Sequence, residues 1–271
     1  MNTKSVLIFI FGFIAASVGT QAQNPELEKI RWQNGPTRSK LGDLAEINVP
    51  AGYKFADASD TRTLMRLLQN PPSGQELGYI EPADGTWFMV FEFNDIGYVS
   101  DDEKRSLDAD AILENLKKGT EQGNIERRKK SWPELHVQGW MQKPAYNDIT
   151  HNLEWAILAE SEGRTIVNYN TRLLGRGGVM RVTLVTDPDA LQQTLPRFKN
   201  AISGFSYSKG NTYAEFLPTD KKAQYGLTAL VAGGAAAAVV KSGGAKWLGK
   251  AIIAGIIVLM AAVKKLFSKS D

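Results

Sequence analysis

A run of three β-rich segments, joined by two short turns that contain glycine, constrains this chain more than any other part of its sequence. The run covers residues 151–187. Within it, apolar side chains recur at every second position, as at Leu153 and Trp155, which is the period of a strand with one buried face. The turns at 161–163 and 175–178 are short enough to join antiparallel neighbours. The sequence therefore predicts a three-stranded antiparallel meander at the centre of a sheet.

Segments on both sides of this meander have the patterns of further strands and helices, without a regular β-α-β repeat. They predict an α+β fold in which helices pack on an antiparallel sheet. Asp60 is expected to cap the first helix, and Ile125 to lie on the apolar side of the second. Strands are predicted at 44–55 (two short strands around a turn), 77–80, 86–93, 137–141 and 203–207, and helices at 57–69, 107–130 and 188–202.

The uneven distribution of charge indicates contact with a membrane and argues against a nucleic-acid partner. The whole chain of 271 residues has a formal net charge of +3. Residues 241–271 hold six lysines and one aspartate, which gives +5, and Lys4 adds +1, so the remaining segment 23–240 carries −3. A nucleic-acid-binding domain would gather positive charge on its folded body. Lysines that flank apolar segments are instead typical of a chain at a membrane surface.

The N-terminal end has the pattern of a secretory leader. Lys4 precedes an apolar run at 6–16, and the small residues Thr20 and Ala22 fit a cleavage site. The apolar run is short for a membrane span, which needs about 20 residues. We therefore expect residues 1–22 to be a cleaved signal peptide rather than an uncleaved anchor.

The C-terminal end holds a segment that is long and apolar enough to cross a bilayer. As a helix, residues 247–267 would cover about 30 Å, and the lysines beyond them fit a cytoplasmic tail at 268–271. The preceding stretch 221–246 is either a juxtamembrane segment or a first crossing, and its weaker hydrophobicity favours a single crossing. Small residues recur at helical spacing between 226 and 237, which fits oligomerisation through helix packing or simply the helix propensity of alanine.

The sequence offers little for catalysis or for a metal ion. It contains no cysteine and only two histidines, His136 and His151, with no second ligand at useful spacing, so no metal site and no cofactor are expected. It contains no Gly-x-Ser-x-Gly nucleophile turn. The acidic residues at 101–103 are interpreted as negative charge at a helix start rather than as a calcium loop.

The most unusual polar pattern lies in the middle strand of the predicted meander. Asn168, Asn170 and Arg172 fall on one face of that strand, and Arg176 lies in the glycine-rich turn that follows. Two amides and a guanidinium in a row are able to bind a polar ligand or a partner strand, and the turn is able to offer N–H groups to an anion. The alternative, which the pattern favours, is a solvated strand face and an ordinary hairpin turn.

Glu92 is a further candidate for binding, because it interrupts a strand that is otherwise lined with aromatic residues. A carboxylate in that position is expected either at a wet edge or paired, for example with Arg172 or Arg181. A hydrolase site would require Glu92 and His151 to meet the polar face formed by Asn168, Asn170 and Arg172. Such a hydrolase site is the alternative to a non-catalytic binding site.

Several stretches of the chain are similar to one known family. They are 87–93 with 97–99 and Asp101-Asp102, then 151–156, 167–176, and 225–227 running into 232–234. In these stretches the chain resembles the bacterial membrane-anchored proteins grouped as domain of unknown function 2167. The resemblance implies a leader, an extracytoplasmic domain and a C-terminal anchor, and it brings no catalytic residues.

These observations together predict a protein of the bacterial cytoplasmic membrane whose domain, residues 23–220, lies on the periplasmic side. The expected function is that of a non-catalytic binding or interaction module, with the lipid bilayer and an unknown envelope protein as partners. The alternatives are an envelope hydrolase and a structural subunit of a membrane complex. No feature of the sequence assigns an enzymatic activity.

Overall fold

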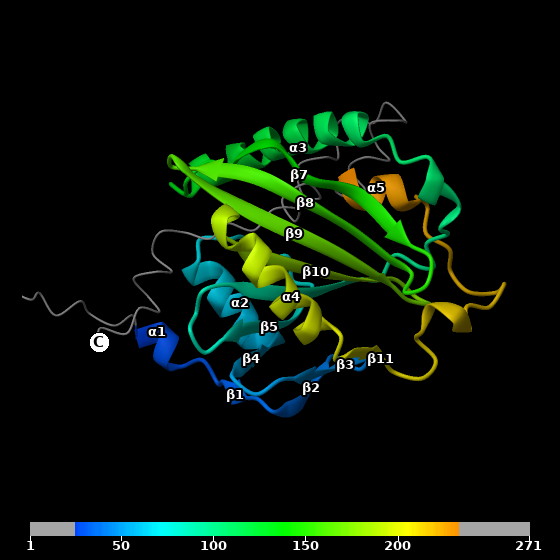
Figure 1. Cartoon of the computed structure of the whole chain (residues 1–271), viewed down its shortest axis with the longest axis horizontal. Coiled ribbons are helices and arrows are strands. Elements are labelled where there is room, and N and C mark those ends of the chain that lie inside the picture. Colours follow the sequence, from blue (N-terminus) through cyan, green and yellow to red (C-terminus); the bar gives the residue numbers. More distant parts are fainter. Residues whose placement is uncertain (1–24, 233–271) are drawn as a thin grey trace, which may run out of the picture.

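The computed structural model describes residues 25–232 and contains one large antiparallel sheet and one small one (Figure 1). In spatial order the large sheet comprises β1 (Gln33–Asn34), β4 (Tyr53–Asp57), β5 (Glu76–Pro82), β6 (Phe88–Asn94), β10 (Val179–Thr186), β9 (Arg164–Leu174), β8 (Asn152–Ser161) and β7 (His136–Asn147). The small sheet comprises β11 (Phe205–Tyr207), β3 (Ala45–Val49) and β2 (Thr37–Leu41). The helices are α1 (Pro25–Glu28), α2 (Ala58–Leu67), α3 (Ala109–Lys129), α4 (Leu191–Ile202) and α5 (Leu227–Ala232), with short 3-10 turns η1 (Asp102–Arg105), η2 (Pro188–Ala190) and η3 (Tyr213–Glu215). The α+β class predicted from the sequence is confirmed.

The predicted meander is present as β8, β9 and β10, which are consecutive neighbours in the large sheet. Its register pairs Trp155 of β8 with Asn170 of β9, and Arg172 of β9 with Arg181 of β10. Residues that are directly opposite in an antiparallel pair point to the same face of the sheet. The apolar side of β8 and the polar side of β9 therefore share one face.

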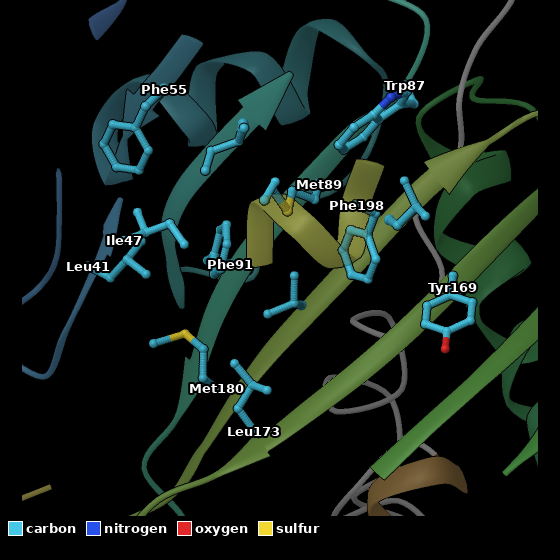
Figure 2. Packing of buried hydrophobic residues seen from close by; sticks show 14 of the residues in the cluster. Leu41, Ile47, Phe55, Trp87, Met89, Phe91, Tyr169, Leu173, Met180 and Phe198 are labelled. Carbon is cyan, nitrogen blue, oxygen red and sulfur yellow. The ribbon is translucent and has the colours of Figure 1, made fainter. Parts of the chain in front are cut away.

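One face of the large sheet packs against α4 and the small sheet. Figure 2 shows Leu41 and Ile47 of the small sheet on the same side as Phe91, and Phe198 of α4 lies close to Tyr169 of β9. The rings of Tyr169 and Phe198 meet edge to face, with their centroids 5.7 Å apart. This cluster of buried apolar side chains is the main core of the domain.

The opposite face is covered by helices at its two sides. Leu64 of α2 and Leu68, which directly follows α2, pack with Tyr79 on β5 and form one cluster. On the other side, α3 lies along β7 (Figure 1), and its Ile112 packs in a second cluster that contains Trp155 of β8 and residues of α5. The middle strands β6, β10 and β9 lie between these two sets of helices.

The start of α2 differs from the prediction, because Asp57 and not Asp60 is its cap. The Asp57 carboxylate accepts hydrogen bonds from the backbone N–H groups of Ser59 at 2.9 Å and Asp60 at 3.0 Å. Strand β4 runs up to Asp57, so the helix begins without an intervening loop. The Asp60 carboxylate instead accepts hydrogen bonds from the backbone and side chain of Arg31, both at 3.0 Å.

Helix α3 buries polar residues where an apolar one was expected. Ile125 is 47% exposed, whereas Asn124 and Arg127 are buried. Asn124 both donates to the carbonyl of Leu135 at 2.8 Å and accepts from its N–H at 2.9 Å. The irregular segment between α3 and β7 has backbone groups that need partners, and these side chains supply them.

Strand β7 is longer than the predicted 137–141 and forms an edge of the sheet. Its pairing with β8 is interrupted at three places by register shifts. Lys143 and Pro144 lie in the C-terminal half of β7. Irregular pairing, a lysine and a proline are common ways of protecting a sheet edge from pairing with another chain.

The packing of the domain continues past residue 220. Tyr98 and Lys222 form an isolated β-bridge, and Leu227, Leu230 and Val231 of α5 are buried. None of the helices within 25–232 has the length and apolar character that a membrane crossing requires. The predicted signal peptide 1–22 and the predicted transmembrane helix 247–267 lie outside the described residues.

Two neighbouring glycines in the turn between β9 and β10 provide a test of this packing. A Cβ atom at Gly178 would lie 2.1 Å from the carbonyl oxygen of Asn94, whereas a Cβ atom at Gly177 would meet nothing within 4 Å. We expect Gly178→Ala to lower the free energy of unfolding by about 1–3 kcal/mol, because backbone must move to accommodate the methyl group. Urea unfolding of the two single variants, with Gly177→Ala as the control, measures the difference. Equal stabilities would contradict the close approach of β6 to this turn.

Candidate functional site

The candidate residues of the middle strand are buried, so their interpretation as a solvated face is wrong. Asn168 and Asn170 are 0% exposed, and Arg172 is 4% exposed. They lie on the same face of the sheet as Trp155 and Ile157 of β8, which are also buried. The polar side of β9 is covered because it packs beside the apolar side of its neighbour.

These residues belong to a larger set of buried polar side chains on three adjacent strands. They share the face of the sheet that lies between α2 and α3, and each of them is less than a tenth exposed. We call this set the polar row; it comprises Glu92 of β6, Arg181 and Thr183 of β10, and Arg172, Asn170 and Asn168 of β9.

Glu92 is paired, as one of the sequence-based alternatives proposed, and its partner is Arg181. Its Oε2 atom lies 3.3 Å from a guanidinium nitrogen of Arg181, and its Oε1 atom accepts a hydrogen bond of 2.6 Å from Ser73 Oγ. Ser73 lies in the loop after α2 and also donates to Glu76 Oε1 at 3.1 Å. The Oε2 atom of Glu76 is buried without a hydrogen-bond partner.

Arg172 forms no ion pair with any residue of 25–232. Its guanidinium donates to the Thr171 carbonyl and to Asn170 Oδ1, both at 3.3 Å, and lies 4.5 Å from the centre of the Trp155 ring. Asn170 Oδ1 also accepts a hydrogen bond of 3.3 Å from Thr183. Burial, and secondarily the charge of Arg181, hold the pKa of Arg172 well below its usual value, with Glu92 acting in the opposite direction.

Two contacts connect the elements that lie on this face of the sheet. Helices α2 and α3 meet where Arg127 donates to the carbonyl of Gln69 at 3.3 Å. Tyr225, just before α5, lies close enough to Arg181 for that positive charge to lower the pKa of the Tyr225 hydroxyl. Burial is the larger effect and raises this pKa. Elements α2, α3 and α5 therefore lie on the same face of the sheet as the polar row.

Arg176 does not join the polar row. Its guanidinium makes a bidentate ion pair with Asp220, with nitrogen–oxygen distances of 2.6 Å and 2.8 Å. Its backbone N–H donates to the Asn211 carbonyl at 2.9 Å. Its guanidinium also donates to the carbonyl of Gly210 at 3.4 Å. The glycine-rich turn thus fastens the segment 210–220 to the end of the sheet, which is a structural role.

His151 shares no contact partner with Glu92 in the part of the chain that the structure describes. It has a left-handed backbone with φ of 53°, which fits its place in the turn between β7 and β8. Its Nδ1 atom is 3.1 Å from the hydroxyl of Tyr146, and its ring centroid is 4.7 Å from that of Tyr213. The structure therefore does not bring His151 and Glu92 to shared partners, as the hydrolase alternative requires. Within residues 25–232 no three His, Asp or Glu side chains are grouped so as to hold a metal ion.

The acidic stretch at 101–103 has a role that the sequence did not predict. The Glu103 Oε2 atom accepts a hydrogen bond of 2.8 Å from the backbone N–H of Thr228 at the start of α5. A Cβ atom at Gly226 would lie 2.6 Å from the Glu103 carboxyl carbon. Gly226, which the sequence suggested for helix packing, is used here for close approach within the same domain.

Ser73 and Glu76 contribute to the site although the sequence analysis did not name them, and Trp155 contributes although it was predicted only as a core residue. Ser73 follows two prolines in the loop before β5, and its hydroxyl reaches Glu92 of β6. Trp155 was assigned to the core from its spacing, which is correct, but its indole Nε1 is buried without a hydrogen-bond partner. An unpaired indole N–H has no signal in the sequence, since it depends on what surrounds the ring.

The Glu92–Arg181 pair provides a test of the energetics of the polar row. We expect Glu92→Gln to lower the free energy of unfolding by about 3 kcal/mol, the lower end of the range for breaking a buried ion pair, because glutamine still accepts a hydrogen bond. Glu126→Gln is the control, since it removes an exposed pair with Lys129 on the surface of α3. That variant is expected to change stability by less than about 0.5 kcal/mol. Equal losses in urea unfolding would contradict the buried pairing.

The Arg176–Asp220 pair predicts a specific acid sensitivity. The hydrogen bond and charge of Arg176 lower the pKa of Asp220 from its ordinary 3.8 to about 2. The group therefore contributes stability above its unfolded pKa, and that contribution is lost as the pH falls from about 4 through 2. In urea unfolding, Asp220→Asn should show a shallower loss of stability over this range than the wild type. Asp189→Asn, at an exposed position, should keep the wild-type profile, and a wild-type profile for Asp220→Asn would contradict the pairing.

Several solved structures are distant matches to this chain. Cyanobacterial PsbP (CyanoP) from Synechocystis sp. PCC 6803 is 11% identical, covers 66% of this chain and 92% of its own, and has a TM-score of 0.37. The Ran-binding protein Mog1p of Saccharomyces cerevisiae is 11% identical, covers 69% and 100%, and has a TM-score of 0.34. LpqN of Mycobacterium tuberculosis, described as involved in cell envelope biogenesis, is 16% identical, covers 66% and 92%, and has a TM-score of 0.30. At these scores the likeness does not bear on function.

No curated protein matches the chain. One family model matches residues 33–264, a range that includes every strand described above and α5. The resemblance found in the sequence at 87–93, 151–156 and 167–176 is thereby confirmed. These three stretches lie in or next to β6, β8 and β9, the strands around the polar row. The chain belongs to the family described as Protein of unknown function (DUF2167).

Proposed function

We propose that this protein is a non-catalytic binding module of the bacterial cell envelope. In this proposal the N-terminal leader exports the chain, the apolar segment 247–267 holds it at the cytoplasmic membrane, and the folded domain lies on the periplasmic side. The charge distribution of the sequence supports this placement, because the lysines gather around the apolar C-terminal segments and the domain is mildly acidic.

The main support for a binding function is the buried guanidinium of Arg172. Burying a charge without a counter-ion costs several kcal/mol, and buried ions in proteins are normally paired or bound to a ligand. Arg181 obeys this rule through Glu92, whereas Arg172 receives only neutral acceptors and an aromatic ring from residues 25–232. A group that binds here would remove the cost, which favours a binding site over a purely structural network.

The hydrolase alternative receives no comparable support. Both oxygens of Glu92 are engaged, by Arg181 and Ser73, and His151 contacts Tyr146 and Tyr213 instead. The structural-subunit alternative depends on the small residues at 226–237. The described part of that stretch packs inside the domain, since Gly226 approaches Glu103 and Ala229 is buried.

Introduced cysteines test the placement cleanly, because the chain has none of its own. Ile149, which is 90% exposed in the turn between β7 and β8, reports on the folded domain. We expect a membrane-impermeant maleimide added to spheroplasts to label Ile149→Cys and Lys246→Cys but not Ser268→Cys. All three should be labelled after permeabilisation, which is the control for reactivity.

The possible outcomes separate the alternatives. Labelling of Lys246→Cys and Ser268→Cys on opposite sides supports a single crossing between them. If Ile149→Cys is labelled and Lys246→Cys is protected until permeabilisation, the C-terminal region crosses twice. If Ile149→Cys is protected, the domain is not on the periplasmic side, and the proposed function is wrong.

A further inference from the structure

We propose that Arg172 and Trp155 together bind a singly charged oxyanion, the carboxylate or phosphodiester group of a ligand, on the sheet face between α2 and α3. This inference rests on the proposed binding function and names the chemical class of the ligand. It is drawn from hydrogen-bond donors that the fold buries side by side, of which those of Arg172 are satisfied in part and that of Trp155 is not satisfied within residues 25–232.

The guanidinium of Arg172 has more donors than the protein satisfies. An arginine carries five N–H donors in a planar fork. Here one nitrogen donates to the Thr171 carbonyl and another to Asn170 Oδ1, each at 3.3 Å, which is at the long end of hydrogen-bond distances. Most of the donors of a side chain that is 4% exposed therefore lack an acceptor within residues 25–232.

Trp155 adds an independent observation. Its indole Nε1 is buried with no hydrogen-bond partner, and an indole nitrogen is a donor only. The guanidinium carbon of Arg172 lies 4.5 Å from the centre of the same ring. Two adjacent groups that both need acceptors, one of them cationic, match an anionic group with at least two acceptor oxygens.

The chain itself does not supply this anion to Arg172. Glu92 is held by Arg181 and Ser73, and Glu76 lies one strand further, against Ser73. Outside 25–232 the sequence contains no acidic residue in 1–24, and Asp271 is the single acidic residue in 233–271. The missing negative charge is therefore expected from another molecule.

The charge of the site also limits the ligand. Glu92 neutralises Arg181, so Arg172 is the arginine of the polar row without a directly paired counter-ion in residues 25–232; the other buried carboxylate nearby, Glu76, lies one strand further. A singly charged anion matches the single charge of Arg172, whereas a buried dianion would leave an uncompensated negative charge. A carboxylate and a phosphodiester both meet this condition, and the phosphodiester of a lipid headgroup is one possible source.

The experiment follows the indole N–H signal of Trp155 by nitrogen–proton NMR, with the full chain in neutral detergent micelles. The signal is assigned with Trp155→Phe, and acetate, dimethyl phosphate and phosphatidylglycerol added to the micelles are the probes. We expect a saturable shift of this signal and a rise in Tm, because a ligand that binds the folded state stabilises it. A response to the soluble probes identifies a free anion, and a response to phosphatidylglycerol alone identifies a lipid headgroup.

Variants on the same strand decide whether Arg172 is responsible. Arg172→Met, which keeps the length of the side chain without charge, should bind the responding probe at least tenfold more weakly. Arg164→Met is the matched control, since Arg164 lies on the same face of β9 at its exposed end, and it should bind like the wild type. Should Arg172→Met fail to fold, Arg172→Lys keeps the charge but loses the fork and is expected to be folded with weakened binding.

Three results would overturn the inference: no saturable shift with any probe, unchanged affinity in Arg172→Met or Arg172→Lys, or unchanged Tm response in Trp155→Phe. Each of these leaves the cysteine labelling of Ile149→Cys unaffected, so a failure here is distinguishable from a failure of the proposed placement. Conversely, anion binding by a domain on the cytoplasmic side would overturn the envelope placement alone.

Discussion

The covering of β9 on both of its faces is the constraint on which the rest of this structure depends. A strand sends alternate side chains to opposite faces, so a strand in the middle of a doubly covered sheet buries all of them. On one face Tyr169 packs with Phe198 of α4, and on the other Asn170 and Arg172 lie beside Trp155. The main core and the polar row are thus two consequences of one arrangement.

Within the polar row, Arg172 and Arg181 lie directly opposite each other on neighbouring strands but have different surroundings. Arg181 is neutralised by Glu92, which Ser73 holds in place from the loop after α2. Arg172 is stabilised by a ring face and by neutral oxygens, which solvate a charge less well than water does. The asymmetry arises from the sheet order, because β6 supplies a carboxylate to β10 and β8 supplies an indole to β9.

Much of the fold was predictable from the sequence, because the period of apolar residues determines element type locally. The meander at 151–187 and the coverage of β6 on both faces, visible in the apolar Phe88 and Val90, follow from that period. The burial of Asn168, Asn170 and Arg172 does not follow, since polar residues on alternate positions have the same pattern whether water or a neighbouring helix covers them. The polar row depends on which strand lies beside which, and that choice is made by tertiary packing. The cap of α2 and the burial of Arg127 were missed for a related reason, because each depends on where a preceding or following segment ends.

The attachment of the last described residues has a mechanical consequence. Tyr98 pairs with Lys222, Arg176 clamps Asp220, and Glu103 holds the backbone of Thr228 at the start of α5. Any tension on the chain beyond Ala232 would reach the domain through these three points, which connect to β6, to the turn after β9 and to η1. These attachments follow one another along the chain, so such tension would have to break them in turn before it reached β11 and the strands of the sheets.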